Sequence, residues 1–176
     1  MKILNLQLGL RVLAVILCLP TTVLAAPPAE LERLEYFVGE WSCQQPADNP
    51  EPSGEFIWNV ELGLNNYWYL GNSKQALTPD DGQAIDTQEF LGYDSAAQKL
   101  IRSVVVSNGN SYNLTADDWQ DEMLVWQGII SLAGKSTALR QEMVRDSEDR
   151  FITSYFVLGK DNNWLPIVDE SCDRRQ

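Results

Sequence analysis

The clearest hydrophobic pattern in the chain is the period of two in GEFIWNVELGL, residues 54–64. Its apolar positions fall on one face, and the opposite face is mostly polar. This alternation predicts a half-buried antiparallel strand. The residues on the apolar face are Phe56, Trp58, Val60, Leu62 and Leu64.

Further β-rich runs follow, each bounded by short turn sequences. They are NYWYLGNSK, AIDTQEFLGYD, KLIRSVVVS, SYNLTA, EMLVWQGII, ALRQEMVRD, RFITSYFVLG and NWLPIV. Together with a first strand at Glu40–Gln44, they make about ten strands. Asn65-Asn66 and Asn108-Gly109 are turn candidates, and the second pair favours a primed hairpin turn. Pro166 indicates an edge position or a strand irregularity.

A single helix is expected before the strands. Leu31, Leu34 and Phe37 or Val38 recur at intervals of three and four. This spacing predicts a short amphipathic helix over Ala29–Val38. A helix followed only by antiparallel strands favours an all-β, closed, up-and-down barrel of about 8–10 strands, because closure removes exposed sheet edges.

The N-terminus resembles an export signal. Positive residues precede the apolar run VLAVILCLP, and Ala25 ends a segment typical of a cleavage site. We expect a signal peptide over 1–25 and a single barrel domain over 26–176, with longer loops at 44–55 and 75–86. The protein should then be periplasmic or extracellular, without stable membrane insertion. Retention of the signal as an anchor is the alternative.

Composition narrows the possible chemistry. The net charge of −12 opposes nucleic-acid binding, because phosphate backbones are also negative. The absence of histidine excludes Ser-His-Asp and Cys-His catalysis and histidine-based metal or haem sites. No metal site or cofactor is expected. The acidic clusters lack the spacing of a calcium loop and match the composition of turns.

Two cysteines remain after the proposed signal, Cys43 and Cys172. An even pair in an exported chain predicts one disulfide. In a closed meander the first strand lies beside the last, which brings these cysteines within reach of each other. The alternative is a reactive thiol at Cys43, but no histidine or Cys-x-x-Cys motif is present to activate it.

The segment Gly39-Glu40-Trp41, placed after a helix and before a run of strands, resembles the opening of the calycin superfamily, which includes lipocalins and fatty-acid-binding proteins. LERLEYFVGEWSC, FLGYDSAAQKL and ESCDRR are similar to segments of exported bacterial proteins of an uncharacterised calycin-like domain family. The resemblance implies that Trp41 plugs one end of the barrel. It also implies that a late arginine, Arg174 or Arg175, packs across the indole.

The barrel interior is the expected place of function. An apolar wall for a small ligand is predicted from aromatic and alternating residues: Trp58, Val60, Leu62, Tyr69, Phe90 and Trp126. Packing that simply fills the barrel is the other interpretation of these residues. Arg102, Arg140 and Arg145 are expected to face outward, although an inward arginine could anchor a carboxylate.

These features favour an exported protein that binds a small, partly hydrophobic or amphipathic molecule. An enzyme of isomerase, cyclase or hydrolase type using the same cavity is the first alternative, and no catalytic residue can be selected for it. An extracytoplasmic interaction protein without a ligand is the second.

Overall fold

The computed structural model describes residues 26–45, 55–75 and 84–176. The expected signal peptide lies outside the described residues, as do most of the two predicted longer loops. Within the described part, no helix is long and apolar enough to cross a membrane.

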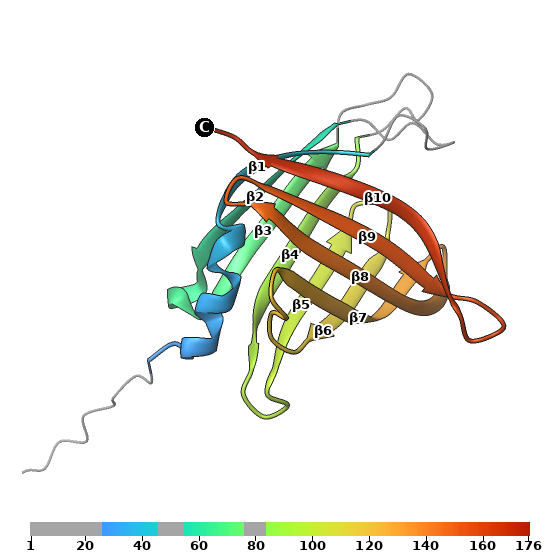
Figure 1. The fold of residues 1–176 in the computed structure, drawn as a ribbon, viewed down its shortest axis with the longest axis horizontal. Coiled ribbons are helices and arrows are strands. Elements are labelled where there is room, and N and C mark those ends of the chain that lie inside the picture. The colour runs from blue at the N-terminus through green and yellow to red at the C-terminus, as the bar shows by residue number, and fades with distance from the viewer. Residues whose placement is uncertain (1–25, 46–54, 76–83) are drawn as a thin grey trace, which may run out of the picture.

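Ten antiparallel strands form a closed barrel, in the order β1-β10-β9-β8-β7-β6-β5-β4-β3-β2 (Figure 1). The strands are β1 (Gly39–Gln44), β2 (Phe56–Gly63), β3 (Trp68–Gln75), β4 (Asp86–Asp94), β5 (Lys99–Val106), β6 (Ser111–Ala116), β7 (Met123–Leu132), β8 (Lys135–Ser147), β9 (Arg150–Leu158) and β10 (Trp164–Arg174). The predicted all-β, closed, up-and-down architecture is therefore confirmed.

The barrel closes where β1 meets β10. Trp41 lies opposite Arg174, and Cys43 lies opposite Cys172. On its other side β1 pairs with β2, where Trp41 lies opposite Trp58. First and last strands are thus neighbours, as the closed meander requires.

The N-terminal helix η1 (Ala29–Phe37) is a 3-10 helix that ends one residue before the predicted boundary. Leu31, Leu34 and Phe37 are its buried residues. Their regular spacing of three matches the three residues per turn of a 3-10 helix, which aligns them on one face. This face packs over one end of the barrel (Figure 1).

The turns follow the predicted residues with one change of type. The short helix η2 (Leu64–Asn66) joins β2 to β3, with positive φ at Asn65 and Asn66. In the β5–β6 turn only Gly109 of the Asn-Gly pair has positive φ, at 87°. The Gly109 amide donates to the Val106 carbonyl at 2.9 Å. The predicted primed turn is therefore wrong: the chain forms an unprimed turn, which ends at a glycine in the left-handed conformation.

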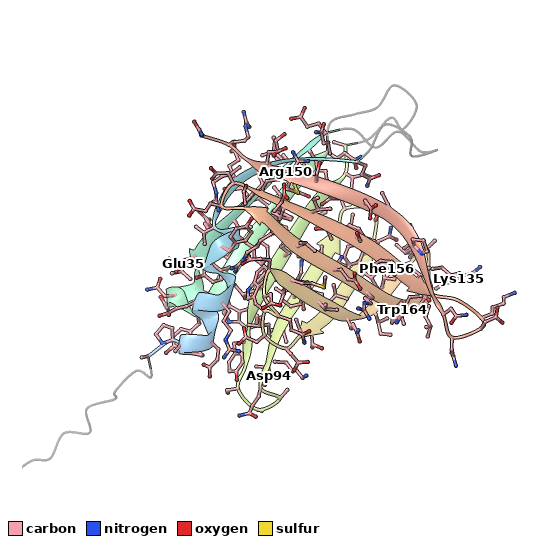
Figure 2. The ribbon with its side chains drawn as sticks, in the orientation of Figure 1. Glu35, Asp94, Lys135, Arg150, Phe156 and Trp164 are labelled. Atoms are coloured by element: carbon pink, nitrogen blue, oxygen red, sulfur yellow. A yellow bond between two sulfur atoms is a disulfide. The ribbon has the colours of Figure 1, made fainter. Side chains whose placement is uncertain are left out.

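The barrel has two different ends. η1 and the start of β9 mark one end, where Glu35 and Arg150 lie (Figure 2). The opposite end carries the start of β8 and the β9–β10 connection, with Lys135, Phe156 and Trp164. Pro166 lies in β10 near that end, beside a register shift between Pro166 and Val168. The predicted irregularity is therefore present.

Candidate functional site

The end covered by η1 is densely packed around Trp41, which is fully buried. Its indole Nε1 donates to the Phe37 carbonyl at 2.9 Å. The guanidinium of Arg174 lies 4.2 Å from the centre of the indole. Arg175 instead forms an exposed ion pair with Glu40. Of the two arginines left open by the sequence, Arg174 is the one that lies across Trp41.

Arg174 also fixes the backbone that leads into β1. Its Nη1 donates to the Val38 carbonyl at 2.5 Å, and its Nη2 donates to the Tyr36 carbonyl at 2.9 Å. Gly39 has φ of +123°, and a Cβ there would lie 2.9 Å from Arg174 Nη1. The Gly-x-Trp motif therefore needs glycine for both its backbone angle and the space taken by the arginine.

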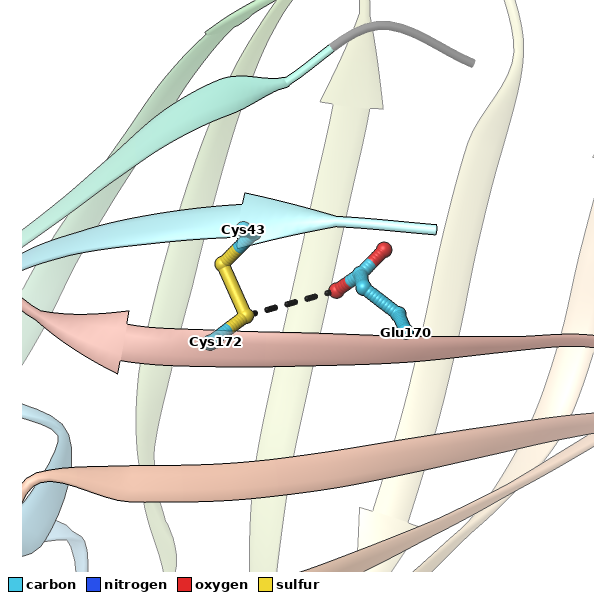
Figure 3. A group of neighbouring side chains, drawn as sticks. All are labelled: Cys43, Glu170 and Cys172. Atoms are coloured by element: carbon cyan, nitrogen blue, oxygen red, sulfur yellow. Dashed lines mark hydrogen bonds between the residues drawn. A yellow bond between two sulfur atoms is a disulfide. The ribbon is translucent and has the colours of Figure 1, made fainter. Parts of the chain in front are cut away.

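Cys43 and Cys172 form a disulfide across the β1–β10 seam, with their Cα atoms 4.0 Å apart (Figure 3). This confirms the predicted pairing. Glu170 Oε1 lies 3.7 Å from Cys172 Sγ. The two sulfurs and this carboxylate come close enough together to suggest a metal site, but sulfurs in a disulfide are not thiolate ligands.

A cavity of about 300 Å³ occupies the barrel beyond the disulfide. Gln75, Ile85, Asn108 and Asn110 line its outer part, so it reaches the surface at the end opposite η1. The wall combines apolar and polar side chains. Its apolar members include Phe56, Trp58, Val104, Val106, Met143 and Phe151, and its polar members include Glu89, Arg102, Tyr112, Thr153, Tyr155 and Glu170.

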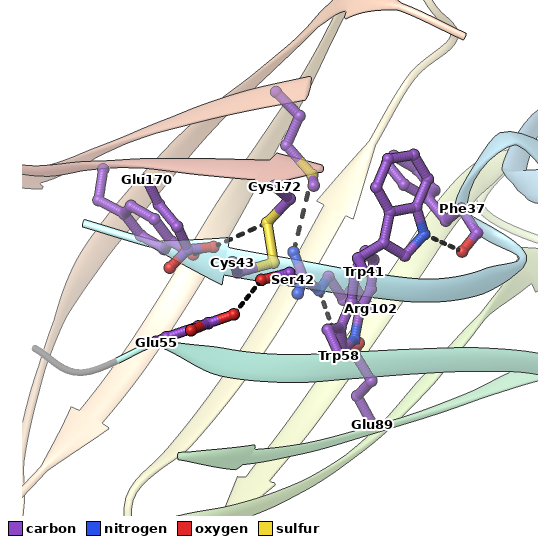
Figure 4. The surroundings of a disulfide bond; sticks show 12 residues. Phe37, Trp41, Ser42, Cys43, Glu55, Trp58, Glu89, Arg102, Glu170 and Cys172 are labelled. Atoms are coloured by element: carbon purple, nitrogen blue, oxygen red, sulfur yellow. Dashed lines mark hydrogen bonds and ion pairs between the residues drawn. A yellow bond between two sulfur atoms is a disulfide. The ribbon is translucent and has the colours of Figure 1, made fainter. Parts of the chain in front are cut away.

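A buried ion pair between the neighbouring strands β4 and β5 forms part of the cavity wall. Arg102 Nε donates to Glu89 Oε2 at 2.8 Å, and these side chains are 12% and 2% exposed. The indole Nε1 of Trp58 donates to the same carboxylate (Figure 4). Arg102 Nη1 reaches Gln141 Oε1 at 3.1 Å. Such a pair is retained in an interior only when its hydrogen bonds are satisfied, as these are.

Gly71 on β3 makes room for the buried carboxylate. A Cβ at this position would lie 2.3 Å from Glu89 Cγ. Gly71 is also the register partner of Glu89 across the β3–β4 pair. Space left by a glycine on one strand therefore lets a charged side chain point inward from the next.

A second carboxylate in the wall, Glu170 on β10, is 8% exposed. Among the described residues it has no cation within ion-pair distance, and the Tyr155 hydroxyl donates to its Oε1 at 3.5 Å. Burial raises the pKa of Glu170 to about 7, against the opposing effects of Arg102 and Tyr155. Burial also raises the pKa of Tyr155 well above its usual value.

Among the described residues, five buried side-chain atoms have no hydrogen-bond partner, and of these only Thr153 Oγ1 belongs to a residue that lines the cavity; the others are Trp126 Nε1, Arg140 Nε, Gln141 Nε2 and Arg145 Nε. Thr153 is fully buried. Buried polar atoms are nearly always paired in proteins, so the Thr153 hydroxyl on the cavity wall indicates a place where a bound molecule could donate or accept.

The six predicted wall residues have different locations. Trp58 lines the cavity. Val60, Tyr69 and Trp126 are buried in the packed core instead. Leu62 and Phe90 are 45% and 42% exposed and lie outside the cavity, which corrects the prediction for both. Leu62 shares a face with Val60 but lies at the end of β2, beside the turn. Phe90 faces outward because Glu89 and Leu91 take the inward positions of β4.

The prediction that Arg102 faces outward is wrong, because it lies in the cavity. Arg140 and Arg145 do not line the cavity: Arg140 pairs with Glu142, and Arg145 stacks 3.5 Å from the ring centre of Trp119. Glu89 and Glu170 were not among the candidate residues predicted from the sequence. For Glu89, the available signal was Gly71 on the neighbouring strand, because a glycine opposite a strand of mixed polar and apolar residues leaves room for an inward side chain.

Comparison with known protein families finds no match, and comparison with curated proteins finds no similar sequence.

Proposed function

We propose that this is an exported protein that binds a small amphipathic molecule inside a calycin-like barrel. The observation that carries this proposal is the cavity of about 300 Å³, whose wall has apolar side chains together with a few buried polar groups. Ligand sites commonly combine a mainly apolar surface with a small number of oriented polar groups.

The closed antiparallel barrel and the Trp41–Arg174 packing support the calycin-like assignment. The disulfide supports export, because disulfides persist mainly in oxidising compartments. The signal-like residues 1–25 support the same location.

Binding of a solvent-sensitive dye to two matched variants tests the binding proposal. Val104 lines the cavity, whereas its neighbour Val105 is exposed on the outer face of the same strand. Val104→Phe should fill the cavity and abolish dye binding. Val105→Phe adds the same side chain outside and should leave dye binding unchanged. Equal dye binding by both variants would rule out the cavity as the binding site.

A second candidate function is general acid–base catalysis, favoured by the pKa of about 7 for Glu170 in a cavity wall. A carboxylate with this pKa can take a proton from a carbon next to a carbonyl. Incubation with simple ketones in deuterium oxide should then show deuterium incorporation by NMR, and Glu170→Gln should abolish it. Exchange at the same rate in that variant would exclude Glu170 as the base.

A further inference from the structure

We propose that the cavity selects ligands that carry a cationic amine, which pairs with Glu170, and that it discriminates against carboxylates. This inference rests on the proposed binding function and specifies its ligand class. It is carried by the distribution of charges and unused hydrogen-bonding atoms in the wall.

Among the residues that the structure describes, the charged groups of the wall are Glu89, Arg102 and Glu170. Arg102 and Glu89 neutralise each other through their 2.8 Å ion pair. Glu170 has no cation within ion-pair distance among the described residues, so an ionised Glu170 leaves the site with one negative charge in excess. A buried charge is stable only when it is paired, and a ligand cation would supply the missing partner.

An anionic ligand would find no free cation in the described part of the wall to pair with. Among the described residues, Arg102 is the cation of the wall, and its Nε already donates to Glu89 while its Nη1 donates to Gln141. A ligand carboxylate at Arg102 would lie beside the Glu89 carboxylate and would be repelled by it. The buried arginine therefore does not make this an anion site.

Neighbouring groups suit an amine held at Glu170. Thr153 lies directly opposite Glu170 in the β9–β10 pair, and its Oγ1, which has no partner in the described part of the chain, can accept a second N–H. The aromatic rings of Tyr112, Tyr155 and Trp58 also line the cavity, and aromatic faces attract cations. Phe56 and Val106 line the wall toward the surface and provide contact for an apolar tail.

Affinity for an amine should depend on pH through Glu170. The groups that face it are Arg102 from β5, Glu89 from β4 and Tyr155 from β9, together with the disulfide, which does not titrate. Burial raises the pKa of Glu170 to about 7, so the carboxylate is largely protonated at about pH 6 and largely ionised at about pH 8. Amine affinity should rise about tenfold between these values.

The test is calorimetric binding of hexylamine, hexanol and hexanoate to the intact protein. Hexylamine should bind most tightly and hexanoate most weakly at about pH 8. Glu170→Gln keeps the size of the side chain and should weaken hexylamine by about tenfold or more, while hexanol binding stays within about twofold. Asp169→Asn, an equal charge change at the exposed neighbouring position, should leave all three affinities unchanged.

A measurement on the unaltered protein checks the same idea without a variant. Hexylamine binding at about pH 6 should release close to one proton, seen as different heats in buffers of different ionisation enthalpy. If hexanol binds but hexylamine binds no more tightly than hexanoate, or if no proton is released, the amine inference is overturned and the binding proposal stands. If neither the dye nor any of the three probes binds, both are overturned.

Discussion

The end of the barrel under η1 and the cavity beyond the disulfide are built from similar residues with different results. At the η1 end, Trp41, Phe37 and Phe151 pack ring against ring, and the indole N–H and the Arg174 guanidinium have backbone acceptors. In the cavity, Trp58 and Arg102 converge on the Glu89 carboxylate (Figure 4). The Thr153 hydroxyl has no hydrogen-bond partner there among the described residues.

This difference in how buried groups are paired distinguishes residues that stabilise the fold from residues that could bind a ligand. Groups that are fully paired and closely packed contribute to folding and have nothing left to offer a ligand. Groups that are buried with unused capacity reduce stability, and proteins retain them mainly where they bind or react. The paired and closely packed groups around Trp41 therefore belong to the scaffold. Arg145 Nε beside η1 also has no partner among the described residues, but only the unpaired Thr153 hydroxyl belongs to a residue that lines the cavity, so the cavity wall carries the candidate site.

The largest effect should come from emptying the η1 end. Trp41→Ala removes a fully buried indole and should lower the free energy of unfolding by about 4–5 kcal/mol, measured by denaturant titration. Trp164→Ala, a part-exposed tryptophan at the opposite end, is the matched control and should cost much less. Equal losses would show that the two ends do not differ in packing.

Breaking the cavity ion pair should be nearly as costly. Glu89→Gln leaves the Arg102 charge buried without a counter-charge and should destabilise the protein by about 3–4 kcal/mol. The double variant Glu89→Gln with Arg102→Met removes both charges and should recover most of this loss. A double variant no more stable than the single one would contradict this account of the pair.

Glu170→Gln should instead stabilise the protein, and only at higher pH. The pKa of Glu170 is about 7 in the folded protein, above the value of 4.5 for an unperturbed glutamate. Between these two pH values, the folded protein therefore binds a proton at Glu170 that the unfolded chain does not. Stability conferred by the protonated form is therefore lost as pH rises from about 4.5 through about 7, by about 3 kcal/mol. Unfolding at about pH 5 and pH 8 should show this loss in the wild type but not in Glu170→Gln, with Asp169→Asn as the control.

The smallest effect should come from the surface of the η1 end. Arg175 and Glu40 form an ion pair at 2.7 Å in which both side chains are about half exposed. Solvent screens such pairs, so Arg175→Ala should change the free energy of unfolding by less than about 1 kcal/mol. Arg174→Ala should cost clearly more in the same titration, because that arginine holds two backbone carbonyls; similar costs would remove the distinction between them.

The fold could be predicted because its signals are local. Alternation within GEFIWNVELGL and the short turn sequences favour a series of antiparallel strands. The cost of exposed sheet edges favours closure of that series, and one distant pair of cysteines fits it. The type of helix at Ala29–Phe37 was missed, although the spacing of its buried residues by three favours the tighter 3-10 form.

The cavity could be predicted only in part, because alternation does not say which of two mixed faces points inward. In β4, Phe90 and Leu91 are both apolar, and hydrophobicity alone cannot assign them. The face of β4 that points inward depends on its pairing with the neighbouring strand β3, where Gly71 leaves the space that Glu89 fills. Arg102 on β5 points inward because it pairs with the Glu89 carboxylate on β4. This contact between two strands cannot be predicted from either sequence segment alone.

The β1–β10 seam has a consequence for how the chain folds. Among the described strands, every other pairing joins neighbours in the sequence, so closure of the barrel depends on one contact between residues far apart along the chain. The disulfide lies at this contact, with a sequence separation of 129. Closing so long a loop is the entropically expensive step for an unlinked chain. Once oxidised, the polypeptide is a ring whose ends stay together in the unfolded state, so refolding no longer includes that search.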